Sequence, residues 1–269
     1  MAVTLWIALG LLAAASVLPK AYNSRFLSGS SGWIFLSIYW FMQPPSYIEI
    51  QDYFNAFLVV AAAIFALFIA YITFQARNNE EGGHEVLISL SRAASVGGLI
   101  YFLFVDVEFL NIGIISLVTN QTIWIVEQLG YPVAQVAWNQ LAVGGLLPIE
   151  IILACTAIES IALFMGLISS ATKATLSQKF KAFMISVPVI YSLNLLRTSL
   201  TASAYGLAWF GTPDESFHIT EHFIAKIGSL AALFVISYTI LKMLPEVTDM
   251  IDDIFKLLKI EFRKLARLN

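Results

Sequence analysis

Residues 53–74 of this chain read YFNAFLVVAAAIFALFIAYITF, a stretch without a single Asp, Glu, Lys or Arg. A helix needs about 20 such residues to cross the roughly 30 Å hydrocarbon core of a bilayer, so the segment predicts a transmembrane helix. Four stretches are similarly long and apolar, and a fifth at the N-terminus is slightly shorter: 86–105, 148–170, 183–205, 219–241 and 2–18. We therefore predict an all-α polytopic membrane protein with about six transmembrane helices.

The composition of the chain agrees with this fold class. Of its 269 residues, 59% are hydrophobic and 12% are charged, and the mean hydropathy is +0.80. A soluble domain carries about 25% charged residues, so this chain has too little charge to keep a soluble surface dispersed. The same numbers exclude a disordered chain and a small secreted domain. The net charge of −3 excludes a nucleic-acid-binding protein, because no basic field exists to attract a polyanion.

Two other apolar segments do not read as clear spans. Residues 33–42 are too short to cross and are rich in Trp and Tyr, which favour the membrane boundary. Residues 111–129 are long enough but contain Asn120 and Glu127 among other polar residues. We predict that this second segment forms an interfacial or partly buried helix.

The basic residues predict the orientation. With six spans and a cytoplasmic N-terminus, most Lys and Arg residues lie in inner loops and in the C-terminal tail, and Lys20 and Arg25 are left in an outer loop. This arrangement satisfies the positive-inside rule. A seventh span would move Arg77 and Arg92 to the outside, which the same rule disfavours.

The chain is expected to have two parts. Residues 1–244 form an integral membrane domain, and residues 245–269 form a cytoplasmic basic tail. The tail has apolar residues at a 3–4 spacing with basic residues between them, which predicts an amphipathic helix on the inner leaflet.

Three reactive or charged side chains are predicted at a similar depth. Cys155 is the one cysteine, Arg197 lies inside a predicted span, and His222 lies near the start of the next span. At 1.5 Å per residue they stand about 22–30 Å above the inner boundary, so we expect them to converge near the outer surface. Each also has a structural interpretation: the thiol as inert packing, the histidine as an interfacial residue and the arginine as a snorkelling side chain.

Together these side chains carry the chemistry of acyl transfer. A thiolate is a nucleophile, and a nearby Arg or protonated His lowers the pKa of a thiol. A guanidinium can stabilise an oxyanion, and an imidazole can protonate a leaving amine. Cys155, Arg197 and His222 are therefore the candidate catalytic residues. Asn194, one helical turn before Arg197, offers it a carbonyl acceptor. Glu159, one turn after Cys155, could orient a base, contact substrate or neutralise Arg197.

Metal chemistry is only weakly indicated. His218 and His222 stand four residues apart, as two zinc ligands on one helix face do, but no third ligand follows at a suitable spacing. A lone cysteine cannot form an internal disulfide or a multi-cysteine metal site. We expect no metal and no organic cofactor.

Three ordered blocks resemble the exosortase/archaeosortase family of membrane transpeptidases. They are LACTAIES at 153–160, PVIYSLNLLR at 188–197, and the pair Glu221–His222 at the start of the last predicted span. The family often has Gly two residues after the cysteine and again two residues further on. This chain has Ala157 and Glu159 at those positions.

The resemblance implies a function. Cys155 would be the nucleophile, Arg197 the electrostatic stabiliser and His222 the acid and base, with Tyr191 and Glu221 as supporting or substrate-binding neighbours. The substrates would be exported surface proteins with a C-terminal sorting signal, cut at the outer face of the cell membrane. The new carboxyl would pass to an acceptor such as a membrane lipid. The main alternative is a transporter or channel, which favours polar groups near the midplane and internal repeats.

Overall fold

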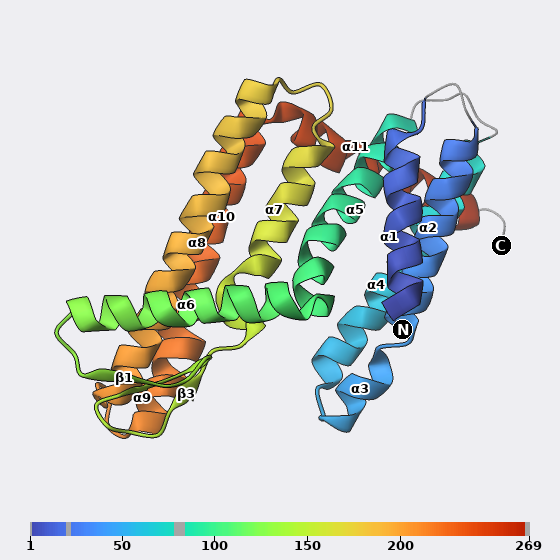
Figure 1. The fold of residues 1–269 in the computed structure, drawn as a ribbon. Coiled ribbons are helices and arrows are strands. Elements are labelled where there is room, and N and C mark those ends of the chain that lie inside the picture. Colours follow the sequence, from blue (N-terminus) through green and yellow to red (C-terminus); the bar gives the residue numbers. More distant parts are fainter. Residues whose placement is uncertain (1, 20–22, 78–83, 267–269) are drawn as a thin grey trace. The chain divides into compact units, whose positions relative to one another are not determined.

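Helices make up most of the described chain, which comprises residues 2–19, 23–77 and 84–266 of this computed structural model (Figure 1). Lys20 and the last residues of the tail, 267–269, lie outside these ranges. The chain divides into two compact units. One comprises Met1–Leu99, Gly166–Ala174 and Leu244–Asn269, and the other comprises Ile100–Met165 and Thr175–Met243.

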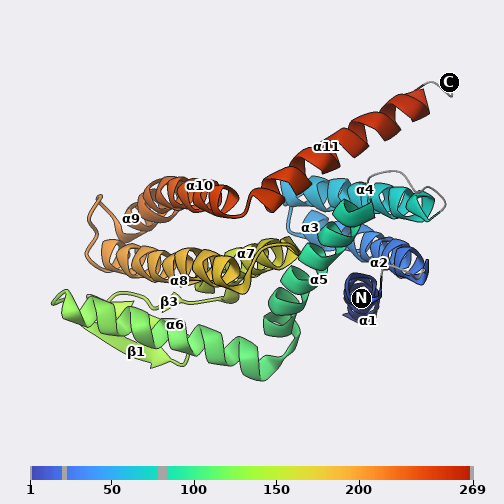
Figure 2. The same cartoon turned by 90° about the horizontal axis from the view of Figure 1, so that it is seen from above.

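The first unit is built around the helix α2. Its helices, which include most of α5 and the end of α7, are α1 (Ala2–Val17), α2 (Ser24–Phe41), α3 (Pro44–Glu49), α4 (Tyr53–Ala76), α5 (His84–Asp106), α7 (Ile158–Ser170) and α11 (Pro245–Ala266). Figure 2 shows α2 between α1 and α4, against which it packs. The buried centre of this unit contains Leu12, Trp33, Ile69 and Leu87.

Helix α2 extends well beyond the segment 33–42, which the sequence marked as too short to cross. It is continuous over 18 residues, and Arg25 lies in its first turn, not in a loop as predicted. Polar side chains on α2 are satisfied by its neighbour, because Ser30 and Ser37 donate hydrogen bonds to backbone carbonyls of α4 at 2.9 and 2.8 Å. The apolar pattern alone gave no sign of this, since Gly and Ser interrupt the run before residue 33.

Five of the described helices are long and apolar enough to cross a membrane: Tyr53–Ala76, Glu85–Asp106, Glu108–Gln128, Leu176–Gly206 and Pro213–Met243. Four of them contain predicted spans, and α1 and α7 are apolar but shorter. The prediction of an all-α polytopic membrane protein is therefore confirmed. The helix Glu108–Gln128 lies across α8 and not alongside it (Figure 1). The number of spans and the domain boundaries remain predictions.

The second unit combines helices with a small sheet. Besides the end of α5 and the start of α7, it contains α6 (Glu108–Gln128), β1 (Val133–Ala137), β2 (Gln140–Val143), β3 (Ile149–Glu150), the 3-10 turn η1 (Leu153–Thr156), α8 (Leu176–Gly206), α9 (Pro213–Ile219), the π-helical segment η2 (Thr220–Ala225) and α10 (Lys226–Met243). The three strands are antiparallel in the order β1-β2-β3. Figures 1 and 2 both show α8 and α10 side by side. The sheet was not predicted.

The predicted span 148–170 is not one helix, which corrects the sequence interpretation. Its first part forms β3 and the turn η1, and only Ile158–Ser170 is α-helical. The two parts meet at Ala157, whose backbone is left-handed with a φ of 62°. Cys155 therefore lies in a turn that precedes a helix, and not inside a membrane-spanning helix.

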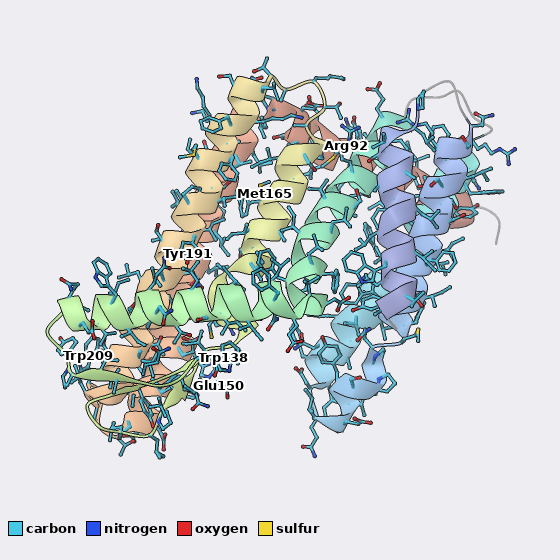
Figure 3. All side chains as sticks on the ribbon, in the orientation of Figure 1. Arg92, Trp138, Glu150, Met165, Tyr191 and Trp209 are labelled. Atoms are coloured by element: carbon cyan, nitrogen blue, oxygen red, sulfur yellow. The ribbon has the colours of Figure 1, made fainter. Side chains whose placement is uncertain are left out.

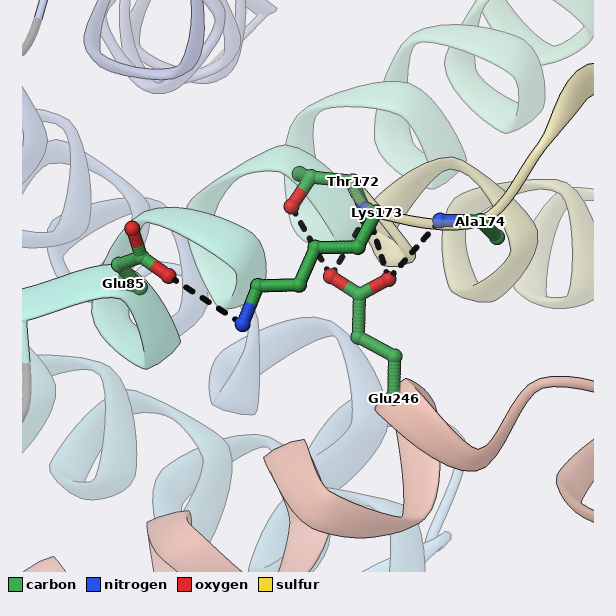
Figure 4. A network of polar contacts seen from close by, with 5 residues as sticks. All are labelled: Glu85, Thr172, Lys173, Ala174 and Glu246. Carbon is green, nitrogen blue, oxygen red and sulfur yellow. Dashed lines mark hydrogen bonds and ion pairs between the residues drawn. The ribbon is translucent and has the colours of Figure 1, made fainter.

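A carboxylate joins the start of α11 to the loop between α7 and α8 in the first unit (Figure 4). Glu246 accepts hydrogen bonds from the backbone N–H groups of Thr172, Lys173 and Ala174 at 2.8, 2.8 and 3.2 Å, and from the Thr172 hydroxyl at 2.9 Å. Lys173 in turn lies 3.7 Å from a carboxylate oxygen of Glu85. These contacts hold the first turn of α11 against the loop, while the placement of the tail on the inner leaflet remains a prediction.

Candidate active site

The nucleophile candidate lies on a constrained turn. The backbone N–H of Cys155 donates a hydrogen bond to the carbonyl of Ile152 at 2.9 Å, which closes the 3-10 turn. The side chain of Cys155 is half-buried and packs against the apolar cluster of the second unit. Since the turn runs into the N-terminal end of α7, the thiol lies near the positive end of a helix dipole, where a thiolate is favoured.

Asn194 connects this turn to α8. Its side-chain Nδ2 donates a hydrogen bond to the carbonyl oxygen of Cys155 at 2.6 Å. The sequence suggested that Asn194 would instead accept a bond from Arg197. Among the described contacts Asn194 makes no hydrogen bond to Arg197, and its amide bonds to the backbone of the turn η1.

Arg197 pairs with Glu221 and not with Glu159. The Nη2 atom of Arg197 lies 3.3 Å from Glu221 Oε1, and both side chains are 25% exposed. The other carboxylate oxygen of Glu221 accepts a hydrogen bond from Thr201 at 3.0 Å. Glu159 accepts one from the Tyr101 hydroxyl at 3.3 Å. The Nε atom of Arg197 is buried and has no hydrogen-bond partner among the described residues.

The charges of this pair reach the thiol. Burial raises the pKa of the Cys155 thiol, the backbone hydrogen bond with Ile152 and the Arg197 guanidinium oppose this rise, and the Glu221 carboxylate adds to it. Asn194 bonds to the backbone of Cys155, Asn194 and Arg197 line one cavity, and Glu221 pairs with Arg197. The structure therefore brings these four residues into one neighbourhood.

A cavity of about 190 Å³ opens beside the nucleophile turn. Its polar lining comes from Asn194, Arg197, Glu159, Ser160 and Ser229. Its apolar lining is shared by the turn, α8 and α10: Ala154, Ala157, Ile190, Leu193, Ala232, Leu233 and Ile236. The two alanines lie in the sequence on either side of Cys155, so the cavity borders the turn that carries Cys155 and has a cation in its wall, while Cys155 itself is not among the lining residues.

Sequence reasoning did not identify the contribution of α10 to this cavity. Ser229, Leu233 and Ile236 lie three to four residues apart, the spacing of one helix face. That periodicity was available in the sequence, but the face carries little charge and did not stand out among apolar residues.

His222 is not among the residues that line the cavity. It belongs to the π-helical segment η2 and is exposed, with its ring centroid 4.8 Å from that of His218. No hydrogen bond or ion pair joins it to Cys155 or Arg197 in the described part of the chain. Its sequence neighbour Glu221 is the residue that reaches Arg197. Among the described residues, no group of three or more His, Cys, Asp or Glu gathers to hold a metal ion.

Tyr191 supports the framework around the site. Its hydroxyl donates a hydrogen bond to the side-chain oxygen of Gln121 on α6. Figure 3 shows Tyr191 on α8, close to where α6 crosses that helix. The contact ties α6 to the helix that carries Arg197, and Tyr191 is not among the residues that line the cavity.

The family can now be assigned. The model of the transmembrane exosortase family matches residues 2–239, which include the nucleophile turn, the Asn194–Arg197 helix and the Glu221–His222 segment. The chain belongs to the transmembrane exosortase family. The exosortase resemblance of the three sequence blocks is thereby confirmed.

Two curated relatives align with this exosortase over most of both chains. It is 27% identical to Archaeosortase A of Haloferax volcanii, over 93% of this chain and 91% of the relative. It is 22% identical to Archaeosortase A of Natronomonas pharaonis, over 92% of this chain and 85% of the relative. No solved structure matches the chain.

Proposed function

We propose that this exosortase is a membrane-embedded cysteine transpeptidase. It cleaves the C-terminal sorting signal of exported surface proteins and transfers the new carboxyl to an acceptor, a membrane lipid. Membership of the exosortase family and the likeness to two archaeosortases support the processing of sorting signals. The observation that carries the cysteine mechanism is the position of Cys155, on a turn held by Asn194 beside a cavity with Arg197 in its wall.

Cleavage starts with attack on the scissile peptide bond. The Cys155 thiolate attacks the carbonyl carbon, and Arg197 donates hydrogen bonds to the oxyanion that forms. Protonated His222 gives its proton to the leaving nitrogen as the C–N bond breaks. The products of this step are a thioester on Cys155 and a released C-terminal peptide.

Transfer regenerates the enzyme. Neutral His222 takes a proton from the hydroxyl or amine of the acceptor, which attacks the thioester carbonyl. The C–S bond then breaks and the Cys155 thiolate leaves, so the thiolate and the imidazolium are both restored. Every proton is accounted for by the acceptor, the leaving amine and His222, and the two steps use no metal or organic cofactor.

The proposed location is the outer side of the cell membrane, with the C-terminal tail in the cytoplasm. The hydrophobic span of a sorting signal would deliver its scissile bond to the outer boundary, where water can reach the unwound peptide. The excess of basic residues in the predicted inner loops supports this orientation.

The decisive experiment removes the thiol. In cells that carry Cys155→Ala, the precursor should remain uncut in the membrane, and Cys155→Ser should retain little activity because a hydroxyl ionises far less readily. Ser192→Ala is a suitable control, because Ser192 lies on the same helix as Arg197. Its exposed hydroxyl has one described hydrogen bond, to the carbonyl of Pro188. Normal processing in the Cys155→Ala cells would contradict the proposal.

A further inference from the structure

The strongest unexplained contact of the site is the one between Asn194 and Cys155. A 2.6 Å hydrogen bond joins the amide of Asn194 to a backbone carbonyl 39 residues away in the sequence. It links the helix α8 to the turn η1, which are distant in the sequence. A link of this kind fixes one element against the other.

The turn has little local support of its own. It is a single 3-10 turn of four residues, and Ile152 before it is extended while Ala157 after it is left-handed. The first backbone bond of α7 runs from the N–H of Ile161 to the carbonyl of Ala157, so the carbonyl of Cys155 precedes the hydrogen-bond ladder of that helix. Without Asn194, this carbonyl would lose its described partner, and a free carbonyl in a half-buried turn is costly.

Asn194 and Arg197 lie one helical turn apart on α8, and both line the cavity. Residues three apart on a helix project to the same side. One rigid turn of α8 therefore carries the group that holds the nucleophile's backbone and the cation that faces the reacting bond.

We propose that Asn194 is a positioning residue, which sets the distance between the Cys155 thiol and the Arg197 guanidinium. It acts through the backbone of Cys155 and not on the substrate. The inference rests on the proposed cysteine transpeptidase function. It goes beyond that function in assigning the alignment of nucleophile and cation to a neutral amide.

The expected signature is slow acylation with normal substrate binding. A misplacement of about 1 Å in a catalytic group costs on the order of 10²-fold in rate. Asn194→Leu, which keeps the approximate size but removes the donor, should lower the single-turnover rate of acylation about 10- to 100-fold. The KM should change little, because leucine keeps the approximate size of Asn194 in the cavity wall and the other lining residues are unchanged.

The test uses the full-length enzyme in detergent and the uncut precursor that accumulates in Cys155→Ala membranes. Asn194→Asp provides a second variant of nearly unchanged shape whose carboxylate cannot donate to a carbonyl, and it should be slowed as strongly. Ser199→Ala is the matched control: it removes a 2.9 Å hydrogen bond from the Ser199 hydroxyl to the carbonyl of Leu195 on the same helix, and it should acylate at the wild-type rate.

The outcomes separate this inference from the proposed function. If the wild-type enzyme forms no acyl-enzyme, the transpeptidase function fails. If the wild type acylates and Asn194→Asp acylates within about twofold of it, the positioning role is wrong, since a lost alignment costs far more. A fall in kcat that is matched by a rise in KM would also overturn the inference, because it would place Asn194 in substrate binding.

Discussion

Two regions of this exosortase use polar groups within apolar helices in opposite ways. In the first unit, the hydroxyls of Ser30 and Ser37 on α2 donate to backbone carbonyls of α4 at 2.9 and 2.8 Å, and Trp33 on α2 donates to Ser91 on α5 at 3.0 Å. Around the cavity of the second unit, Arg197 has an ion pair on one side of its guanidinium and a buried Nε atom without a described partner.

The difference separates polar groups that hold helices together from polar groups that can act on a ligand. A buried donor that is fully satisfied stabilises packing and has no capacity left for a further partner. A cation with an unused donor in the wall of a cavity keeps that capacity. Substitutions near the cavity should therefore change activity more than stability, and substitutions between α1, α2 and α4 should do the reverse.

The largest expected effect belongs to His222, the proposed proton donor. His222→Ala should lose about 10²- to 10⁴-fold in processing rate, as general acid–base catalysts do. His222→Arg should be nearly as slow, because an arginine stays protonated and can neither give a proton to the leaving nitrogen nor take one from the acceptor. The processing rates of both variants, measured at one pH, check this.

The activity of His222→Arg decides whether His222 transfers protons. Substantial activity of His222→Arg would contradict the proposed mechanism, because it would show that a cationic donor is sufficient and that His222 shuttles no proton. His218→Ala is the control, because this ring lies 4.8 Å from that of His222, tilted by 52°, but has no part in the proposed mechanism. It should process at a rate near that of the wild type.

Arg197→Lys is expected to have the next largest effect. Lysine keeps the charge but offers a point donor on a flexible stem instead of a planar fork. The loss of an oxyanion donor costs about 10²- to 10³-fold in kcat, so the variant should process slowly while its unfolding temperature stays near that of the wild type. Full activity of Arg197→Lys would mean that Arg197 serves a structural pair with Glu221.

In the first unit, Gly32→Ala should affect stability and leave the chemistry unchanged. A Cβ at Gly32 would lie 2.8 Å from Leu12 Cγ and 3.0 Å from the Leu12 backbone nitrogen, so α1 must move. Overpacking of this kind costs about 1–3 kcal/mol in the free energy of unfolding. Gly10→Ala on α1 is the control, because a Cβ there meets nothing within 4 Å. Equal stability of the two variants, measured by denaturation in detergent, would refute the close packing of α1 and α2.

The smallest effect is expected at Ala157. A φ of 62° is unfavourable by about 1–2 kcal/mol for an alanine but not for a glycine. Ala157→Gly should therefore raise the free energy of unfolding by about 1 kcal/mol. Ala154→Gly, in the same turn but without a positive φ, should destabilise it instead. A destabilising Ala157→Gly would argue against the left-handed turn after Cys155.

Ala157 also illustrates how far the sequence could predict the site. The left-handed backbone found here is the conformation that glycine adopts most easily. An alanine gives no such signal, so the run from Pro148 to Ser170 read as one apolar helix. Short apolar runs do not distinguish a strand or turn from a buried helix, which is why β3 and η1 were missed.

Long apolar helices such as α4 were predictable, because length and hydropathy alone decide them. The partners of polar groups were not. The sequence offered Glu159 as a residue that could neutralise Arg197 and did not indicate Glu221 in this role, because the observed pair depends on how α8 packs against the segment η2. Periodicity places a residue on a face of its own helix but does not say which helix lies opposite.

The central claim is that Cys155 carries the acyl group between cleavage and transfer. Purified enzyme should be mixed with the precursor from Cys155→Ala membranes, quenched in acid within one turnover and digested for mass spectrometry. The account predicts a peptide containing Cys155 that carries the new C-terminus of the substrate and loses it on treatment with neutral hydroxylamine, as a thioester does. Processed product without any such adduct, or an adduct on another residue, would contradict it.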